Sequence, residues 1–210
     1  MATKSIFLLC DVQSRFRPAI YQYASVIAST NKMLKFAKLF GIPVLATTQN
    51  ARALGPIDPE IDLPSLGSLH LTTLDKSLFG MITEDVKDVL KSQAHPPNVV
   101  IMGIESHICV LQTALQVLDF YQTNKKPVNV SVVADAVSSC NAFEVPLAFD
   151  ALRQAGAKVL SSESIGFSLM RDASLPTFKA FAGIVKESKP STKAAGEALL
   201  VGGSKEKSSM

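Results

Sequence analysis

The sequence has 210 residues, a formal net charge of +3 and 47% hydrophobic residues. This length suits one well-buried globular domain rather than two. The chain carries no basic stripe or nucleic-acid motif, no apolar run near the ~18 residues of a membrane span and no secretory signal pattern, so neither nucleic acid nor a membrane is expected as a partner.

The chain begins with a strand, a helix and a second strand. Residues 5–10 are a continuous apolar run, typical of a strand buried on both faces, and the run ends at Asp11. Helical periodicity follows over residues 20–40, and residues 43–48 predict the second strand. Periodicity is then lost over residues 49–77 among prolines and glycines. A loop this long in a compact domain is usually functional or a lid.

The most informative stretch is at the centre of the sequence. Residues 99–102 predict another buried strand, closed by Gly103, and a helix follows at once. Ser106 is placed to cap that helix. Cys109 then falls in its first turn, where free N–H groups and the positive end of the helix dipole favour a thiolate. This is a position for a nucleophile, although a lone cysteine is more often a small buried hydrophobe.

The last third of the chain repeats the alternation. Strands are predicted at residues 128–134 and 158–161, and helices at residues 145–155 and 176–185. From residue 188 the Lys, Ser and Gly content rises and periodicity stops. We therefore predict one domain over residues 1–187 and a disordered tail over residues 188–210.

Strands that alternate with helices at this spacing predict an α/β fold, a three-layer α/β/α sandwich around a mainly parallel sheet. Ligands bind such sheets outside the carboxyl ends of the strands. Asp11, Gln49, the turn over residues 103–109 and Asp135 all fall at predicted strand ends. We expect these polar or reactive groups to converge on one edge of the sheet.

Three segments resemble, in order and spacing, the motif blocks of the isochorismatase-like cysteine hydrolases. They are residues 10–18 (CDVQSRFRP), 74–80 (LDKSLFG) and 103–114 (GIESHICVLQTA). The similarity runs from about residue 6 to residue 185. Two further segments, residues 48–56 and 176–179, look most like the eukaryotic isochorismatase domain-containing proteins, whose substrates are poorly defined.

Carried over by position, the resemblance implies a catalytic triad of Asp11, Lys76 and Cys109. A free thiol is mostly protonated at neutral pH, so it needs a base and a positive field to become the attacking thiolate. Asp11 can take the proton, and Lys76 supplies the field. The resemblance also implies a cis peptide bond between Ile104 and Glu105. It would help aim the backbone N–H groups of Glu105 and Cys109 at one spot as an oxyanion hole.

The resemblance also suggests pocket residues and argues against a metal. Gln13 and Phe16 match the first motif and are candidates for the substrate pocket, although Phe16 fits a core position equally well. Gln49 fits either a substrate contact or a loop cap. It stands, followed by Asn50 and Ala51, where the nicotinamidase branch of the family has metal ligands. We therefore expect no metal and no cofactor.

The remaining cysteines and histidines receive structural interpretations. Cys10 and Cys140 are taken as structural. His107 lies two residues before Cys109, and residues two apart on a helix point to different sides. We therefore interpret His107 as an exposed or interface residue rather than as a catalytic partner of Cys109. The three cysteines show no disulfide or metal spacing, which suits a reducing compartment. We expect a cytoplasmic protein, with a mitochondrial location as the alternative.

The favoured function is a cofactor-independent cysteine hydrolase that cleaves a small amide, ureido or related C–N bond through a thioester intermediate. One alternative is a catalytically silent binding or scaffold protein of the same fold. A metal-dependent nicotinamidase is less favoured, because the ligands are missing. The expected partners are a small-molecule substrate and further copies of the chain in a homo-oligomer, because symmetric assembly is common.

Overall fold

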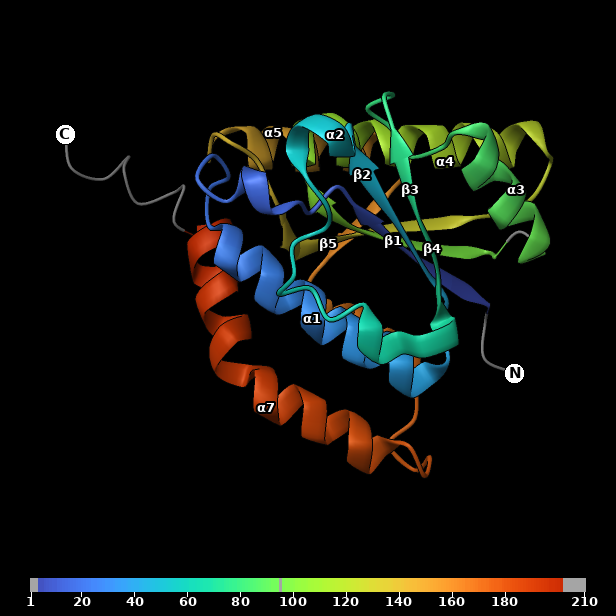
Figure 1. Cartoon of the computed structure of the whole chain (residues 1–210). Coiled ribbons are helices and arrows are strands. Elements are labelled where there is room, and N and C mark those ends of the chain that lie inside the picture. Colours follow the sequence, from blue (N-terminus) through green and yellow to red (C-terminus); the bar gives the residue numbers. More distant parts are fainter. Residues whose placement is uncertain (1–3, 95, 202–210) are drawn as a thin grey trace.

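The structure is a computed structural model that describes residues 4–94 and 96–201 (Figure 1). Its centre is a six-stranded sheet in the order β3-β2-β1-β4-β5-β6, in which every pairing is parallel. The chain winds outward in opposite directions from β1 and β4, so these two strands flank the topological switch point of the sheet. The strands are β1 (Ser5–Cys10), β2 (Val44–Gln49), β3 (His70–Lys76), β4 (Asn98–Ile104), β5 (Asn129–Ser138) and β6 (Lys158–Leu160).

Helices cover both faces of this sheet (Figure 1). One face carries α1 (Tyr23–Phe40), α6 (Ser162–Met170) and α7 (Phe178–Gly196), and the other carries α3 (Glu84–Ser92), α4 (Leu111–Thr123) and α5 (Glu144–Gln154). Shorter helical segments are α2 (Ala51–Leu54), η1 (Ser14–Phe16), η2 (Pro64–Leu69), η3 (Ser106–Val110) and η4 (Glu197–Val201). Within the described residues, no helix is both long enough and apolar enough to cross a membrane. The predicted three-layer α/β/α sandwich is confirmed.

The sheet separates two hydrophobic cores. Phe7 and Leu9 of β1 pack into the core beneath α1, whereas Ile6 and Leu8 pack into the core beneath α4. All six residues of β1 are buried. This burial on both faces explains why the strand is a continuous apolar run rather than an alternating pattern.

Among the elements that the sequence-based prediction missed are an edge strand and a helix. The segment predicted as a loop over residues 49–77 contains β3, an edge strand that pairs only with β2. Its residues are mostly half-exposed or exposed and several are polar, so it lacks the apolar run of a buried strand. Helix α6 was also not predicted. Its N-cap is Ser161, whose hydroxyl accepts a hydrogen bond from the Ser164 N–H at 3.1 Å.

The predicted disordered tail is partly helical. Helix α7 continues to Gly196 and η4 to Val201, so residues 188–201 are ordered helix in the structure. This segment packs on α1, where the Lys32 ammonium donates a hydrogen bond to the Thr192 hydroxyl at 2.9 Å. Buried Ala195 and Leu199 add apolar contacts that its polar composition obscures. The remainder of the predicted tail, residues 202–210, lies outside the described residues.

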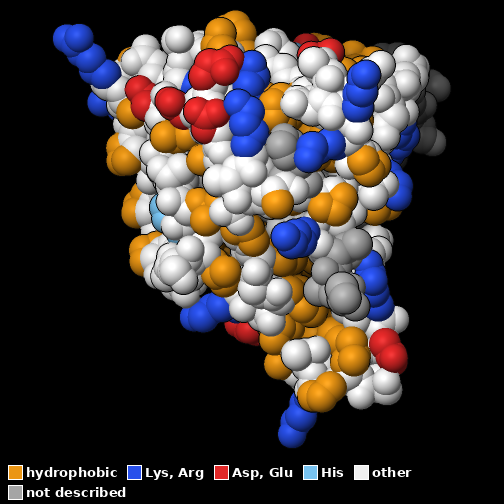
Figure 2. Space-filling view, turned by 90° about the vertical axis from the view of Figure 1, so that its right-hand side faces the viewer, with side chains coloured by type: hydrophobic (Ala, Val, Ile, Leu, Met, Phe, Trp, Pro, Cys, Tyr) orange, Lys and Arg blue, Asp and Glu red, His pale blue; other side chains and the backbone are white. Residues whose placement is uncertain are grey.

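Surface charges are locally mixed. Figure 2 shows one face of the molecule, on which Lys and Arg side chains lie among acidic and hydrophobic ones. On α3, for example, Lys87 pairs with Glu84 at 2.7 Å and Lys91 pairs with Asp88 at 2.9 Å. The small net positive charge therefore does not gather into a single field on this face.

Candidate active site

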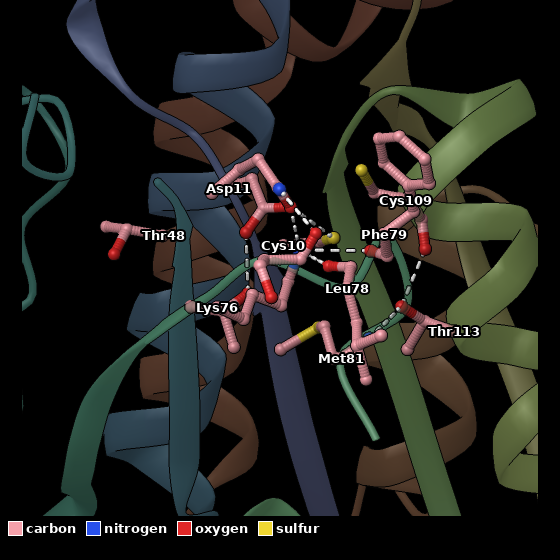
Figure 3. A network of polar contacts seen from close by, with 12 residues as sticks. Cys10, Asp11, Thr48, Lys76, Leu78, Phe79, Met81, Cys109 and Thr113 are labelled. Carbon is pink, nitrogen blue, oxygen red and sulfur yellow. Dashed lines mark hydrogen bonds and ion pairs between the residues drawn. The ribbon is translucent and has the colours of Figure 1, made fainter. Parts of the chain in front are cut away.

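A buried ion pair joins Asp11 and Lys76. Asp11 directly follows β1 and Lys76 ends β3, and the Lys76 Nζ lies 2.6 Å from the Asp11 Oδ2 (Figure 3). Both side chains are buried, with exposed fractions of 1% for Asp11 and 0% for Lys76. The Thr47 hydroxyl donates a second hydrogen bond to the Asp11 carboxylate at 2.7 Å. Asp11 has a φ of 51°, in the left-handed region that aspartate tolerates better than most residues.

The Lys76 ammonium is held by three further oxygen atoms. It donates to the Gln49 Oε1 at 2.8 Å and to the backbone carbonyls of Leu78 and Phe79 at 3.0 Å each. A buried charge is costly unless it is paired and hydrogen-bonded, and this cluster supplies both. The turn after β3 is therefore folded around the ammonium group.

Cys109 lies in η3, the π-helical turn that leads into α4. Single π turns in helices are frequent at functional sites. Its side chain is almost buried, with 8% exposure, and Figure 3 shows the thiol on the side of Asp11. The Thr113 hydroxyl donates to the Cys109 carbonyl at 2.6 Å and accepts from the Met81 N–H at 3.0 Å. These bonds fix η3 against the turn that follows Lys76.

Cys10 connects the Asp11–Lys76 ion pair with Cys109. Its thiol donates to the Asp11 carboxylate at 3.5 Å. Burial raises the pKa of Cys10 well above its ordinary value, and a hydrogen bond with Cys109 and the charge of Asp11 raise it further. Cys10 is therefore a neutral thiol that contacts two of the three predicted catalytic residues, Asp11 and Cys109. The sequence offered no signal for this role, because Cys10 reads as the last apolar residue of β1.

The turn after β4 differs in part from the sequence-based prediction. The peptide bond between Ile104 and Glu105 is cis. Ser106 does not cap the helix: Glu105 is the N-cap residue, without a side-chain cap, and the Ser106 hydroxyl instead pairs with the Ser139 hydroxyl at 2.6 Å. Ser106 turns toward this buried partner in the segment after β5, which the sequence could not place.

The predicted pocket residues serve the framework of the site. The Gln13 side chain is buried, donates to the carbonyls of Gln49 and Gly55, and accepts from the Gln49 N–H at 2.8 Å. Gln49 in turn donates from Nε2 to the Ser77 carbonyl at 2.9 Å while its Oε1 accepts from Lys76. Phe16 is half-exposed and packs against the core beneath α1. The structure thus places Gln13 and Gln49 as residues that hold the loop and the lysine.

Asp135 does not join this edge of the sheet. It lies within β5, which continues to Ser138, and its carboxylate accepts bonds from the Ser162 N–H and hydroxyl, both at 2.6 Å. Its role is to hold the start of α6. The prediction that Asp135 converges with Asp11 is therefore wrong, because the strand extends past the point where its apolar run ends.

His107 and Cys140 lie close to the Glu105 side chain. His107 is half-buried, with Nδ1 2.9 Å from the Ser139 hydroxyl, and its alternative assignment as an interface residue stays a prediction. Cys140, which was predicted to be structural, is exposed. A hydrogen bond to the Glu105 carboxylate is the main cause that raises the pKa of the Cys140 thiol, and some burial adds to it. His70 lies on β3 beside Thr73, and His95 lies outside the described residues.

A cavity in the structure lies away from Asp11, Lys76 and Cys109. A cavity of about 730 Å³ lies at the opposite end of the sheet, lined by residues next to the starts of β1, β2 and β4. Asp11, Lys76 and Cys109 do not line it. Cys109 is 8% exposed, so little of this residue contacts solvent.

The comparisons with known proteins define the family. Residues 5–164 match the model of the isochorismatase domain. The chain is 35% identical over 193 residues to isochorismatase domain-containing protein 2 of Danio rerio, covering 91% of this chain and 92% of the relative. It is 38% identical over 184 residues to the secreted isochorismatase effector Isc1 of Phytophthora sojae, covering 87% and 85%. The protein therefore belongs to the isochorismatase family.

Solved structures agree with this assignment. The MAR1 ribonuclease of Caenorhabditis elegans superposes with a TM-score of 0.76 at 30% identity, covering 88% of this chain and 90% of that one. The YcaC gene product of Escherichia coli, described as an octameric hydrolase of unknown specificity, gives a TM-score of 0.75 at 20% identity, covering 92% of each chain. The second likeness supports the fold alone. The protein thus has the fold of isochorismatase-family hydrolases.

Proposed function

We propose that this protein is a cofactor-independent cysteine hydrolase that cleaves a small amide, ureido or related C–N bond. The observation that carries the proposal is the buried Asp11–Lys76 ion pair beside the Cys109 thiol. A carboxylate, an ammonium group and a thiol held in one buried cluster fit nucleophilic catalysis better than a purely structural role. Cys109 acts as the nucleophile, Asp11 as the proton carrier and Lys76 as the fixed positive charge.

The first half of the reaction acylates the enzyme. Asp11 takes the proton of the Cys109 thiol as the sulfur forms a bond to the substrate carbonyl carbon. The carbonyl electrons move onto the oxygen, which accepts hydrogen bonds from the backbone N–H groups of Glu105 and Cys109. The C–N bond then breaks, and the leaving amine takes the proton held by Asp11. A thioester on Cys109 remains.

The second half releases the acid. Asp11 takes a proton from a water molecule as its oxygen attacks the thioester carbon. The C–S bond then breaks, and the proton returns to the sulfur of Cys109. In both halves, negative charge passes between the thiolate and the carboxylate beside Lys76. The fixed ammonium offsets that charge in a site from which water is largely excluded.

The test is a turnover screen of small amides and ureides that compares the wild type with Cys109→Ala and Cys109→Ser. We expect turnover by the wild type and none by Cys109→Ala. Acid-quenched wild type should carry the mass of the acyl group on the peptide that contains Cys109. Equal turnover by wild type and Cys109→Ala would overturn the proposal and favour the catalytically silent binding protein.

We also propose that the chain assembles into a homo-oligomer. The side chains of Leu78 and Phe79 are exposed by 55% and 54%, although their carbonyls hold Lys76. A second copy that covers these apolar side chains would also shield the catalytic cluster. The octameric state described for E. coli YcaC agrees with this proposal. A monomer in light scattering at micromolar concentration would contradict it.

A cytoplasmic location remains our proposal for the cell. All three cysteines are free thiols in the structure, and unpaired cysteines suit a reducing compartment. The relative from Phytophthora sojae is described as secreted, which is a statement about that protein. Fractionation of cells that express the untagged chain would decide between cytoplasm and mitochondria.

A further inference from the structure

We infer that Glu105, His107 and Cys140 form a binding site for one thiophilic divalent metal ion, with Zn²⁺ as the best match. The three side chains each offer one ligand atom, and these atoms all lie within 4.8 Å of one another. Among the described residues, this is the one group in which three such ligands gather. The site is distinct from the Asp11, Lys76 and Cys109 side chains and does not depend on the proposed hydrolysis.

Two segments far apart in the sequence build the site. Glu105 and His107 come from the turn between β4 and α4, and Cys140 comes from the connection between β5 and α5. The Cys140 N–H donates to the Glu105 carboxylate at 2.7 Å, which ties the two segments together. Glu105 and His107 are half-buried, whereas Cys140 is exposed. An ion can therefore enter from solvent onto ligands that are already held.

Buried hydroxyl groups orient the histidine. The Ser139 hydroxyl lies 2.9 Å from the His107 Nδ1 and 2.6 Å from the Ser106 hydroxyl, and both serine side chains are fully buried. Metal-binding histidines commonly have such a second partner, which fixes the ring and favours binding. This arrangement lowers the entropy that the site must lose when an ion binds.

The ligand chemistry favours Zn²⁺ over Mg²⁺ or Ca²⁺. Thiolate and imidazole are ligands for zinc and other late transition metals, whereas magnesium and calcium prefer oxygen alone. Zinc ligands in a tetrahedron lie roughly 3.5 Å apart, so small side-chain rotations would bring three atoms that already lie within 4.8 Å of one another into place. Water would take the fourth. A thiolate and a carboxylate would also neutralise the two charges of the ion.

A second nucleophilic cysteine is the competing explanation for the same three residues. In a cysteine nucleophile, the thiol pairs with a histidine that removes its proton. Here the ligand atoms of Glu105, His107 and Cys140 all lie within 4.8 Å of one another, so a carboxylate lies beside the thiol as well as the imidazole. A metal ion uses all three groups as ligands. The geometry therefore fits an ion better than a second catalytic centre.

The test uses the full, tag-free chain, because an affinity tag of histidines would itself bind the metal. Titration with Co²⁺ reports thiolate ligation through a charge-transfer band in the near ultraviolet, and calorimetry with Zn²⁺ reports stoichiometry and affinity. We expect one equivalent bound, with micromolar or tighter affinity. Cys140→Ala should abolish the band, and His107→Ala should weaken Zn²⁺ binding at least about tenfold.

Matched controls separate this site from other thiols and histidines. Cys109→Ala and His70→Ala each remove one residue of the same type elsewhere and should leave the band and the stoichiometry unchanged. Thermal melting of every variant without metal shows whether it is folded. Absence of Zn²⁺ binding to the wild type would overturn the inference. So would a charge-transfer band that persists in folded Cys140→Ala.

Discussion

Lys76 is the residue on which the buried charges of the active site depend. Its ammonium is the partner of the Asp11 carboxylate at 2.6 Å and also holds the turn after β3 through two carbonyls. Removal of one partner of a buried ion pair leaves the other charge without compensation, which is more costly than the loss of both. Lys76 therefore contributes to stability as well as to the proposed chemistry.

Lys76→Met should lower the free energy of unfolding by about 3–5 kcal/mol and abolish turnover. Urea denaturation followed by circular dichroism measures the first effect. The double variant Asp11→Asn/Lys76→Met removes both charges, so it should recover part of the stability but none of the activity. If Lys76→Met were as stable as the wild type, the Asp11 carboxylate would not depend on the Lys76 charge for its stability in the folded protein.

Cys10 should make the stability of the fold depend on pH in the alkaline range. Its thiol has a raised pKa in the folded protein, so above the ordinary thiol pKa of ~8.5 the unfolded chain loses a proton that the folded chain keeps. Because the unfolded state then binds fewer protons, stability falls as pH rises, by up to about 1.4 kcal/mol per pH unit from this group. In Cys10→Ala, the free energy of unfolding should fall less steeply with rising pH than in the wild type. Urea denaturation at several pH values above ~8.5 measures this dependence. The same dependence in both proteins would contradict a raised pKa for Cys10.

At the scale of elements, a clamp fastens the long loop between β2 and β3 to the segment between β1 and α1. Arg17 donates two hydrogen bonds to the Asp58 carboxylate at 2.8 Å each, and the Tyr23 hydroxyl donates a third at 3.2 Å. Gln13 adds bonds to Gln49, the last residue of β2, and to Gly55 on the same loop. The loop that leads into β3, the strand that ends at Lys76, is thus held against the segment that follows β1.

Asp58→Asn should loosen this clamp in a pH-dependent way. Burial raises the pKa of Asp58, but hydrogen bonds from Arg17 and from the Glu60 N–H outweigh it, so the pKa lies below its ordinary value. The carboxylate therefore stabilises the fold above the ordinary pKa of ~3.9, and this contribution is lost as pH falls through the lower folded pKa.

We expect Asp58→Asn to cost about 1–2 kcal/mol at neutral pH, with the difference from wild type shrinking in acid. Urea denaturation at several pH values measures both quantities. A difference that is equal at neutral and acidic pH would mean that the charge of Asp58 contributes nothing.

The sequence predicts best those strands that are buried on both faces. β1 and β4 are buried on both faces, so their apolar runs are continuous and easily recognised. β1 ends directly before Asp11, and β4 ends at Ile104, one residue beyond Gly103. β3 is an edge strand with polar residues, and its pattern resembles a loop. The end of β5 is also hidden, because Asp135 is a buried polar residue that bonds to α6 rather than a strand terminus. The sequence thus predicts where a buried strand lies better than it predicts which side chains from other elements contact that strand.

At the scale of the whole molecule, the C-terminal segment belongs to the fold. Lys32 on α1 is almost buried beneath it, and its ammonium bonds to Thr192 at 2.9 Å and lies 3.9 Å from Glu163. Burial lowers the pKa of Lys32, while Asp135 and Glu163 oppose that shift. The Tyr21 hydroxyl donates to the Ala198 carbonyl at 3.1 Å and joins η4 to the start of α1.

A chain that ends at residue 187 should therefore be less stable than one that ends at residue 201. The shorter chain exposes the surface that Ala195 and Leu199 bury and leaves Lys32 without the Thr192 hydroxyl. Loss of this burial should lower the free energy of unfolding by about 2–4 kcal/mol. Urea denaturation of the two chains side by side measures the difference, and the chain that ends at residue 201 is the matched reference because it keeps every described contact. Equal stability of the two would support the prediction of a disordered tail from residue 188, since a packed helix cannot be removed from a marginally stable domain without cost.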